Sequence, residues 1–170
     1  DADGGGFVMA LGSTGIQAIP VIAESAAHLY VCQRTPNYSI PARDRVMTDA
    51  ERNEVKAHYR EIHDSIIHTT LGQRYAMKAG SAFDVSDAER EAIYEADWQK
   101  GGFAIMFNAW EDLYTNEAAN ETLASFVRRK IAETVKDPRT RELLTPRDHP
   151  IGTKRPPLDT RYFETFNRDN

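Results

Sequence analysis

The sequence predicts an α/β fold in which one strand–helix–strand unit is followed by a large all-helical insertion. Three observations predict it. Two short apolar segments flank a small-residue helix near the N-terminus, a proline-punctuated loop follows, and helical signals then fill residues 48–144. At 170 residues the chain is long enough to bury a core of its own.

The N-terminal unit consists of three consecutive segments. Residues 7–11 (FVMAL) are a short apolar run that predicts a buried strand, and small and apolar residues from Ser13 to about Ala27 predict a helix packed on a sheet. Pro20 removes one helical hydrogen bond, and we expect a kink there rather than an end. Residues 28–33 (HLYVCQ) predict a second strand, parallel to the first because a helix joins the two.

The middle of the chain, residues 47–145, carries helix start and stop signals throughout. Thr48 with Glu51 fits the S/T-x-x-E capping box of a helix start. Apolar residues recur at helical spacing and predict an amphipathic helix over residues 117–136. Further signals occur at Ser86 with Glu89, at Gly101–Gly102 and at Asp137–Pro138. We therefore expect a helical insertion, followed by a short polar tail over residues 146–170.

Composition argues against several classes of protein. The formal net charge of −5 argues against a nucleic-acid binder, and no apolar run approaches the roughly 20 residues that a membrane span needs. The single cysteine, Cys32, rules out an internal disulfide framework and is compatible with a reducing compartment. No H-E-x-x-H, C-x-x-C or G-x-S-x-G motif occurs, so we expect neither a metal site nor a serine nucleophile. These observations predict a soluble, cytoplasmic protein that binds neither nucleic acid nor membrane.

The turn between the first strand and the helix is similar to a dinucleotide-binding turn. In the G-x-G-x-x-G pattern, glycines allow a tight turn, close approach of the backbone to a pyrophosphate, and close helix–strand packing. Gly12 and Gly15 occupy the second and third positions, and Ala10 stands in the first. Ser13 and Thr14 add hydroxyl donors at a helix N-terminus, which attracts anions. Two glycines alone are a weak signal, and an ordinary strand-to-helix turn is the alternative.

The residue after the second strand indicates which dinucleotide would bind. About 20 positions beyond such a turn, an acid favours NAD and an arginine favours NADP. Arg34 lies nineteen residues beyond Gly15, with Thr35 beside it and no acid nearby. A guanidinium can hold a 2′-phosphate with two parallel hydrogen bonds. The unit is therefore predicted to be a partial Rossmann-like NADP-binding unit; the alternative for Arg34 is a solvated charge at a strand end.

Aromatic and acidic residues of the insertion are assigned mainly to structure. Phe103, Phe107 and Trp110 are core candidates, with contact to a substrate as the alternative. Glu111 and Asp112 are interpreted as a solvated or capping feature rather than as a catalytic carboxylate pair.

Three separated blocks carry a resemblance to a known family. They are GSTGIQAIPVIAESAAHLYVCQRTPNYSIPA, GGFAIMFNAWEDLYTNEAANETLASFVRRKIAETVKDP and LTPRDHPIGTKRPPLDTRYFETFNRDN. The chain resembles the Baeyer–Villiger monooxygenases of the cyclohexanone and phenylacetone monooxygenase type. These flavoproteins use NADPH and dioxygen to insert oxygen beside a ketone. The likeness implies that residues 1–46 are the first half of a Rossmann-like NADP-binding domain and that residues 47–145 are its helical insertion. Residues 146–170 would be a linker whose Lys-Arg motif leads back toward the sheet and the FAD domain.

The resemblance also implies roles for individual residues. The pyrophosphate and nearby ribose of NADPH would be held by Gly12, Ser13, Thr14, Gly15 and Gln17, and the 2′-phosphate by Arg34, Thr35 and Lys154. Arg155 matches the arginine that the family places beside the flavin, where a fixed positive charge suits the stabilisation of an anion. From composition alone, Lys154 and Arg155 would be a surface basic pair.

The sequence also departs from the family pattern. Ala10 replaces the first glycine, and the FAD-binding half and the F-x-G-x-x-x-H-x-x-x-W-P signature are not in the sequence. The resemblance implies a piece of an FAD- and NADPH-dependent enzyme, inactive alone, whose partners are the FAD-binding domain of the same enzyme, a ketone and O2. Two alternatives stay open: part of a flavin N- or S-hydroxylating monooxygenase, against which QRTPNYSIPA and GTKRPPLDTRYFETFNRDN speak, and a non-catalytic NADP-binding module.

Overall fold

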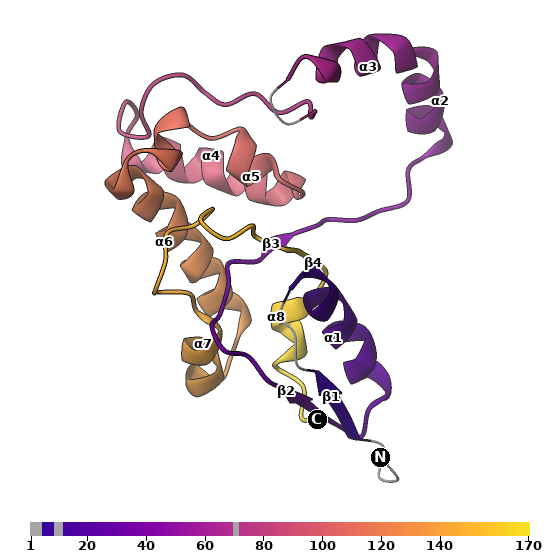
Figure 1. Cartoon of the computed structure of the whole chain (residues 1–170), viewed down its shortest axis with the longest axis vertical. Coiled ribbons are helices and arrows are strands. Elements are labelled where there is room, and N and C mark those ends of the chain that lie inside the picture. The colour runs from indigo at the N-terminus through magenta and orange to yellow at the C-terminus, as the bar shows by residue number, and fades with distance from the viewer. Residues whose placement is uncertain (1–4, 9–11, 70–71) are drawn as a thin grey trace.

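The computed structural model describes residues 5–8, 12–69 and 72–170. Figure 1 shows β1, β2, α1 and α8 gathered around the C-terminus, α6 as a long helix beside them, and α2 and α3 projecting at the end of an extended segment. The elements are, in chain order, β1 (Gly5–Val8), α1 (Ser13–Ser25), β2 (His28–Val31), β3 (Ile40–Pro41), α2 (Asp49–Ala57), α3 (Tyr59–Ile67), α4 (Asp87–Lys100), α5 (Ala104–Phe107), the 3₁₀ turn η1 (Glu111–Tyr114), α6 (Glu117–Thr134), α7 (Pro138–Leu144), β4 (Leu158–Asp159) and α8 (Tyr162–Thr165).

The architecture is a helix-rich α/β fold with small parallel sheets. β1 and β2 pair in parallel, as predicted, from Gly5 opposite His28 to Val8 opposite Val31. The predicted strand bounds were wrong at both strands: β1 already includes Gly5, because the ladder is formed by backbone groups and needs no side chain, and β2 ends at Val31. After the end of β2, the Gln33 side-chain amide donates to the Leu143 carbonyl. Residues 9–11, Ala10 among them, lie outside the described residues.

Helix α1 covers the small sheet and continues through its proline. Ile16, Ile19 and Ala23 are buried at helical spacing, which fixes the face of α1 that packs inward. Pro20 lies inside the helix and forgoes only its own backbone hydrogen bond, so the expectation that it would not end the helix is confirmed. Helix α1 packs against α8 and β4, elements that are distant in sequence.

Residues 47–145 are largely helical, as predicted, and most of their start and stop signals are confirmed. At the start of α4 only half of the expected capping box is present, the hydrogen bond from the Glu89 N–H to the Ser86 side chain. Thr48 and Glu51 form a complete capping box at the start of α2, and Asp137 caps α7 with Pro138 in the first turn. Helix α4 ends at Gly101, whose φ of +74° lies in the left-handed region, and a side chain there would collide with the Ala42 carbonyl. Helix α6 buries the predicted apolar face, Ala119, Leu123, Phe126, Val127 and Ile131, against α4 and η1.

The C-terminal segment is packed into the fold, and the prediction of a polar tail was wrong. Ile151, Tyr162 and Phe163 are buried, and the Asn170 carbonyl accepts a hydrogen bond from the Leu29 N–H at 2.7 Å. The C-terminus therefore lies beside β2 (Figure 1). Prolines and charges separate the buried residues of this segment, so its sequence shows no period, and its packing depends on elements far away along the chain.

Helices α2 and α3 differ from the rest because neither contains a buried residue. They contact each other while projecting from the other elements (Figure 1). Across the part of the chain that the structure describes, no helix has the length and apolar character needed to cross a membrane.

Candidate functional site

The first turn of α1 presents an open helix N-terminus. Gly12 precedes the helix with an ordinary φ of −80°, and a Cβ placed on it would meet nothing within 4 Å. Neither the conformation of Gly12 nor crowding by the described residues requires glycine here. No side chain caps the helix among these residues and no acid lies in its first turn, so its N–H groups favour an anion. Ser13, Thr14 and Gln17 are exposed at this end, and Gly15 is buried.

Arg34 and Thr35 follow β2 directly. Arg34 is exposed and has neither a hydrogen bond nor an ion pair with a side chain of the described residues, while Thr35 is half-buried. The guanidinium is therefore free to bind an external anion.

The structure brings this segment together with the one that carries Lys154 and Arg155. The Asn37 side-chain amide donates to the Arg155 carbonyl at 3.2 Å, across 118 residues of sequence. Farther along, β3 and β4 pair in parallel, and the Ile40 N–H donates to the Pro157 carbonyl at 3.0 Å. Lys154 and Arg155 are both exposed. Arg34 and the Lys154–Arg155 pair thus lie on two segments that are hydrogen-bonded to each other.

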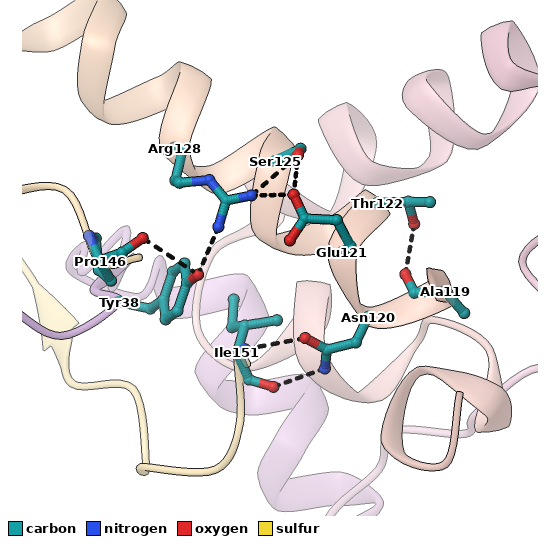
Figure 2. A network of polar contacts seen from close by, with 9 residues as sticks. All are labelled: Tyr38, Ala119, Asn120, Glu121, Thr122, Ser125, Arg128, Pro146 and Ile151. Carbon is teal, nitrogen blue, oxygen red and sulfur yellow. Dashed lines mark hydrogen bonds and ion pairs between the residues drawn. The ribbon is translucent and has the colours of Figure 1, made fainter. Parts of the chain in front are cut away.

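Two side chains of helix α6 form hydrogen bonds with these two segments, as Figure 2 shows. Arg128 donates to the Tyr38 hydroxyl at 2.9 Å, and burial raises the pKa of that hydroxyl, which therefore stays protonated. About two turns earlier on α6, the Asn120 side chain is buried. It donates to the carbonyls of Leu113 and Ile151, both at 2.9 Å, and accepts from the Ile151 N–H at 3.0 Å. The loop after β2 and the segment before Lys154 are therefore both anchored to one rigid element.

The Arg155 side chain borders an apolar pocket. Its guanidinium lies over the Phe103 ring, 5.6 Å from the ring centroid, and forms a cation–π contact with it. The pocket measures about 400 Å³ and is lined by Gln73, Phe103, Met106, Phe107, Tyr114, Gly152, Arg155 and Pro156. An adjoining pocket of about 490 Å³ shares Gln73, Phe107 and Tyr114. Arg155 is thus a fixed cation at the edge of a space suited to an apolar molecule with a polar group.

The aromatic and acidic residues of the insertion divide between core and pocket. Trp110 is buried, as predicted, whereas Phe103 and Phe107 are half-buried and line the pocket. The Asp112 carboxylate accepts from the Ser81 hydroxyl at 2.6 Å and the Ala82 N–H at 3.0 Å, so it has a structural role, but it holds a distant turn and caps no helix among the described residues.

Sequence reasoning missed Asn37, Asn120 and His149, which connect the site. Asn120 had a usable signal, because it is a polar residue on the apolar face of α6, next to Ala119. Asn37 and His149 have no such signal, since their partners are more than 100 residues away.

Comparisons with known proteins find monooxygenases among both the similar sequences and the similar solved structures. No family model matches the chain. It is 40% identical over 163 residues to the 2-oxo-Δ3-4,5,5-trimethylcyclopentenylacetyl-CoA monooxygenase of Pseudomonas putida and 38% identical over 164 residues to a Baeyer–Villiger monooxygenase of Pseudooceanicola batsensis. The chain is homologous to the Baeyer–Villiger monooxygenases. Each match covers 96% of this chain and 30% of the relative, so the chain spans under a third of the length of these curated relatives.

Solved structures of such enzymes have the same fold. A crystal structure of OTEMO in complex with FAD and NADP superposes with a TM-score of 0.95 at 39% identity, covering 98% of this chain and 31% of that one. An oxidised steroid monooxygenase bound to NADP superposes with a TM-score of 0.92 at 44% identity, covering 98% and 32%. The relatives also include the phenazine N-monooxygenase PhzNO1 of Lysobacter antibioticus, 36% identical over 164 residues, or 96% of this chain and 30% of that protein.

Proposed function

We propose that this chain is the NADPH-binding and helical part of a flavin-dependent Baeyer–Villiger monooxygenase, an enzyme that inserts one atom of O2 next to a ketone to give an ester or lactone. The observation that carries the proposal is the hydrogen-bonded junction between the Arg34 segment and the Lys154–Arg155 segment, in a chain homologous to this family. Residues 1–46 begin a Rossmann-like domain, 47–145 form its helical insertion, and 146–170 return toward the sheet and an FAD domain.

NADPH binds, in this proposal, between the N-terminus of α1 and the two joined segments. The pyrophosphate lies at the first turn of α1, where the open space at Gly12 and the absence of an acidic side chain in that turn support an anion. The pyrophosphate and ribose ligands are Gly12, Ser13, Thr14, Gly15 and Gln17. Arg34, Thr35 and Lys154 hold the 2′-phosphate, and two cations there favour NADPH over NADH.

Arg155 is the residue to which we assign a catalytic role. FAD, bound mainly by a part of the enzyme outside this sequence, supplies the oxygen chemistry. The Arg155 guanidinium, held over Phe103, stabilises negative charge at the mouth of the pocket. The apolar lining of Phe103, Met106 and Phe107 excludes water and accommodates the hydrocarbon part of a ketone. The partners are thus a ketone, O2 and the FAD domain of the same enzyme, and the single cysteine fits a cytoplasmic location.

An Arg155→Ala variant of the full-length enzyme tests this role. NADPH should still bind, because Arg34, Thr35 and Lys154 remain, whereas ester formation should fall about 10²–10³-fold through loss of one stabilising charge. The NADPH consumed should appear as hydrogen peroxide. Arg139→Ala, which removes an exposed arginine of α7, is the matched control and should leave ester yield unchanged. A normal ester yield in Arg155→Ala contradicts the assignment.

A second candidate function is N-oxygenation, which the similarity to a phenazine N-monooxygenase favours. The same NADPH site and pocket would then serve an aromatic heterocycle with a ring nitrogen. Supplying the full-length enzyme with a cyclic ketone and, separately, with phenazine distinguishes the two by the product, an ester or an N-oxide. Binding of NADPH without either product supports the third reading, a non-catalytic NADP-binding module.

A further inference from the structure

The side-chain amide of Asn37 lies between His149 and the backbone of Arg155. Its nitrogen donates to the Arg155 carbonyl at 3.2 Å, and its oxygen lies 3.2 Å from His149 Nε2. The other ring nitrogen of His149, Nδ1, lies 2.6 Å from the Asp148 carboxylate, and the His149 side chain is only 9% exposed. A single amide thus joins the loop after β2 to the segment that carries Lys154 and Arg155.

The protonation of His149 decides which way this amide can face. Nδ1 faces a carboxylate and Nε2 faces the amide oxygen, so both contacts are satisfied only when both ring nitrogens carry a proton. If Nε2 loses its proton, it becomes an acceptor, and the Asn37 amide must turn its nitrogen toward it. The amide oxygen would then face the Arg155 carbonyl, and two acceptors repel. The orientation of the Asn37 amide that holds the Arg155 carbonyl is therefore the one that a donating Nε2 favours.

We propose that Asn37 is a positioning residue, and that protonated His149 orients its amide so that the Lys154–Arg155 segment is held against the Arg34 segment. This proposal rests on the proposed function, since the two segments are those to which NADPH binding is assigned. Asn37 itself touches no ligand in this account. It makes binding at Lys154 depend on the integrity of the junction.

Charged and aromatic groups surround His149. The hydrogen bond from His149 lowers the pKa of Asp148, so the carboxylate stays ionised, and Tyr38 packs edge-to-face at 5.4 Å. The other charged groups around this cluster, through their effects on Tyr38 or Asp148, are Glu121, Arg128, Arg147 and Lys154. The negative charge in direct contact with the ring is that of Asp148.

A double-mutant cycle on this chain tests the coupling, with adenosine 2′,5′-bisphosphate as the probe because it carries the 2′-phosphate. Lys154→Ala should weaken binding of the probe about tenfold or more, as expected for loss of a charged hydrogen-bond partner. In an Asn37→Leu background the same change should have less than about a third of that effect, because Lys154 is no longer held in place. Arg139→Ala is the control, since it removes an exposed basic side chain of α7 outside this cluster, and its effect should add independently.

The pH dependence distinguishes positioning from general loss of structure. The affinity ratio between the unmodified chain and Asn37→Leu should decrease as the pH is raised, because only a ring that donates from both nitrogens satisfies both contacts. Taking the ratio cancels the titration of the probe's own phosphate. His149→Gln offers a donor that does not titrate, and the ratio measured in that background should be independent of pH. Additive effects in the cycle, or a flat ratio in the unmodified chain, overturn the proposal.

A readout without any cofactor separates this proposal from the proposed function. In nitrogen-resolved NMR spectra of the chain, the Asn37 side-chain amide should shift together with the His149 ring nitrogens as pH is raised. If the amide signal does not follow the ring, the junction does not work as proposed, whatever the chain binds. If it does follow but neither NADPH nor the probe binds at any pH, the positioning of Arg155 by Asn37 stands and the proposed function fails.

Discussion

At the scale of single residues, a few buried or half-buried polar side chains join parts of the chain that are far apart in sequence. Asn37 reaches the Arg155 carbonyl, and Ser39 hydrogen bonds to Asp159 within the β3–β4 pair. Asp159 is only 8% exposed, and burial raises its pKa to about 6 from an ordinary 3.8. A buried polar group that joins two segments therefore also makes stability depend on pH.

We expect Asp159→Asn to stabilise the protein above about pH 6 and to have little effect near pH 4. A carboxyl whose pKa is raised by folding binds its proton more tightly in the folded state, so its contribution to stability declines as pH rises from 3.8 to about 6. The full difference corresponds to about 3 kcal/mol as an upper bound. Urea unfolding at pH 4 and pH 8 measures it. Asp44→Asn, at an exposed position, is the control, and an Asp159→Asn effect equal at both pH values contradicts the explanation.

At the scale of elements, α6 organises the molecule. Its apolar face is buried against α4 and η1, and Asn120 and Arg128 on the same helix hold Ile151 and Tyr38 (Figure 2). The helix itself was predictable, because its period and its neighbours' caps are local properties of the sequence. The positions of Asn37 and His149 were not, because each depends on a partner brought near by the whole fold. The C-terminal segment was mispredicted for the same reason.

Asn120→Ala should lower the free energy of unfolding by about 2–4 kcal/mol. It removes three hydrogen bonds and leaves the Leu113 carbonyl and both backbone groups of Ile151 without partners in a buried place. Denaturant unfolding measures the change. Glu117→Ala, exposed in the first turn of the same helix, should change it by less than about 1 kcal/mol. An equal decrease in the free energy of unfolding in the two variants would contradict a stabilising role for the Asn120 hydrogen bonds.

Backbone amides of α2 and α3 should exchange with solvent much faster than those of α6. Neither helix contains a buried residue, whereas α6 has seven. Elements with little buried surface open at low free energy, and hydrogen exchange reports that opening. Mass-spectrometric exchange over residues 49–67 and 117–134 makes the comparison. Similar protection in both ranges would show that the projecting helices are held by contacts not accounted for.

At the scale of the whole molecule, the described residues include a helix N-terminus without a side-chain cap, Arg34 after β2, and a Lys154–Arg155 pair on a segment that is hydrogen-bonded to the Arg34 segment. The first two were predictable from a glycine pattern and its spacing to Arg34. Their junction with Lys154 and Arg155 was implied only by family resemblance, since no local pattern relates residues so far apart. The superposition on NADP complexes of homologous enzymes supports the proposal that this arrangement binds NADPH.

Calorimetric titration of this chain with NADPH and with NADH tests the central claim most directly. We predict that NADPH binds at least about tenfold more tightly, and that Arg34→Ala removes most of this preference by weakening NADPH about ten- to hundredfold while leaving NADH nearly unchanged. Equal binding of the two cofactors, or an equal loss of both in Arg34→Ala, would contradict the account.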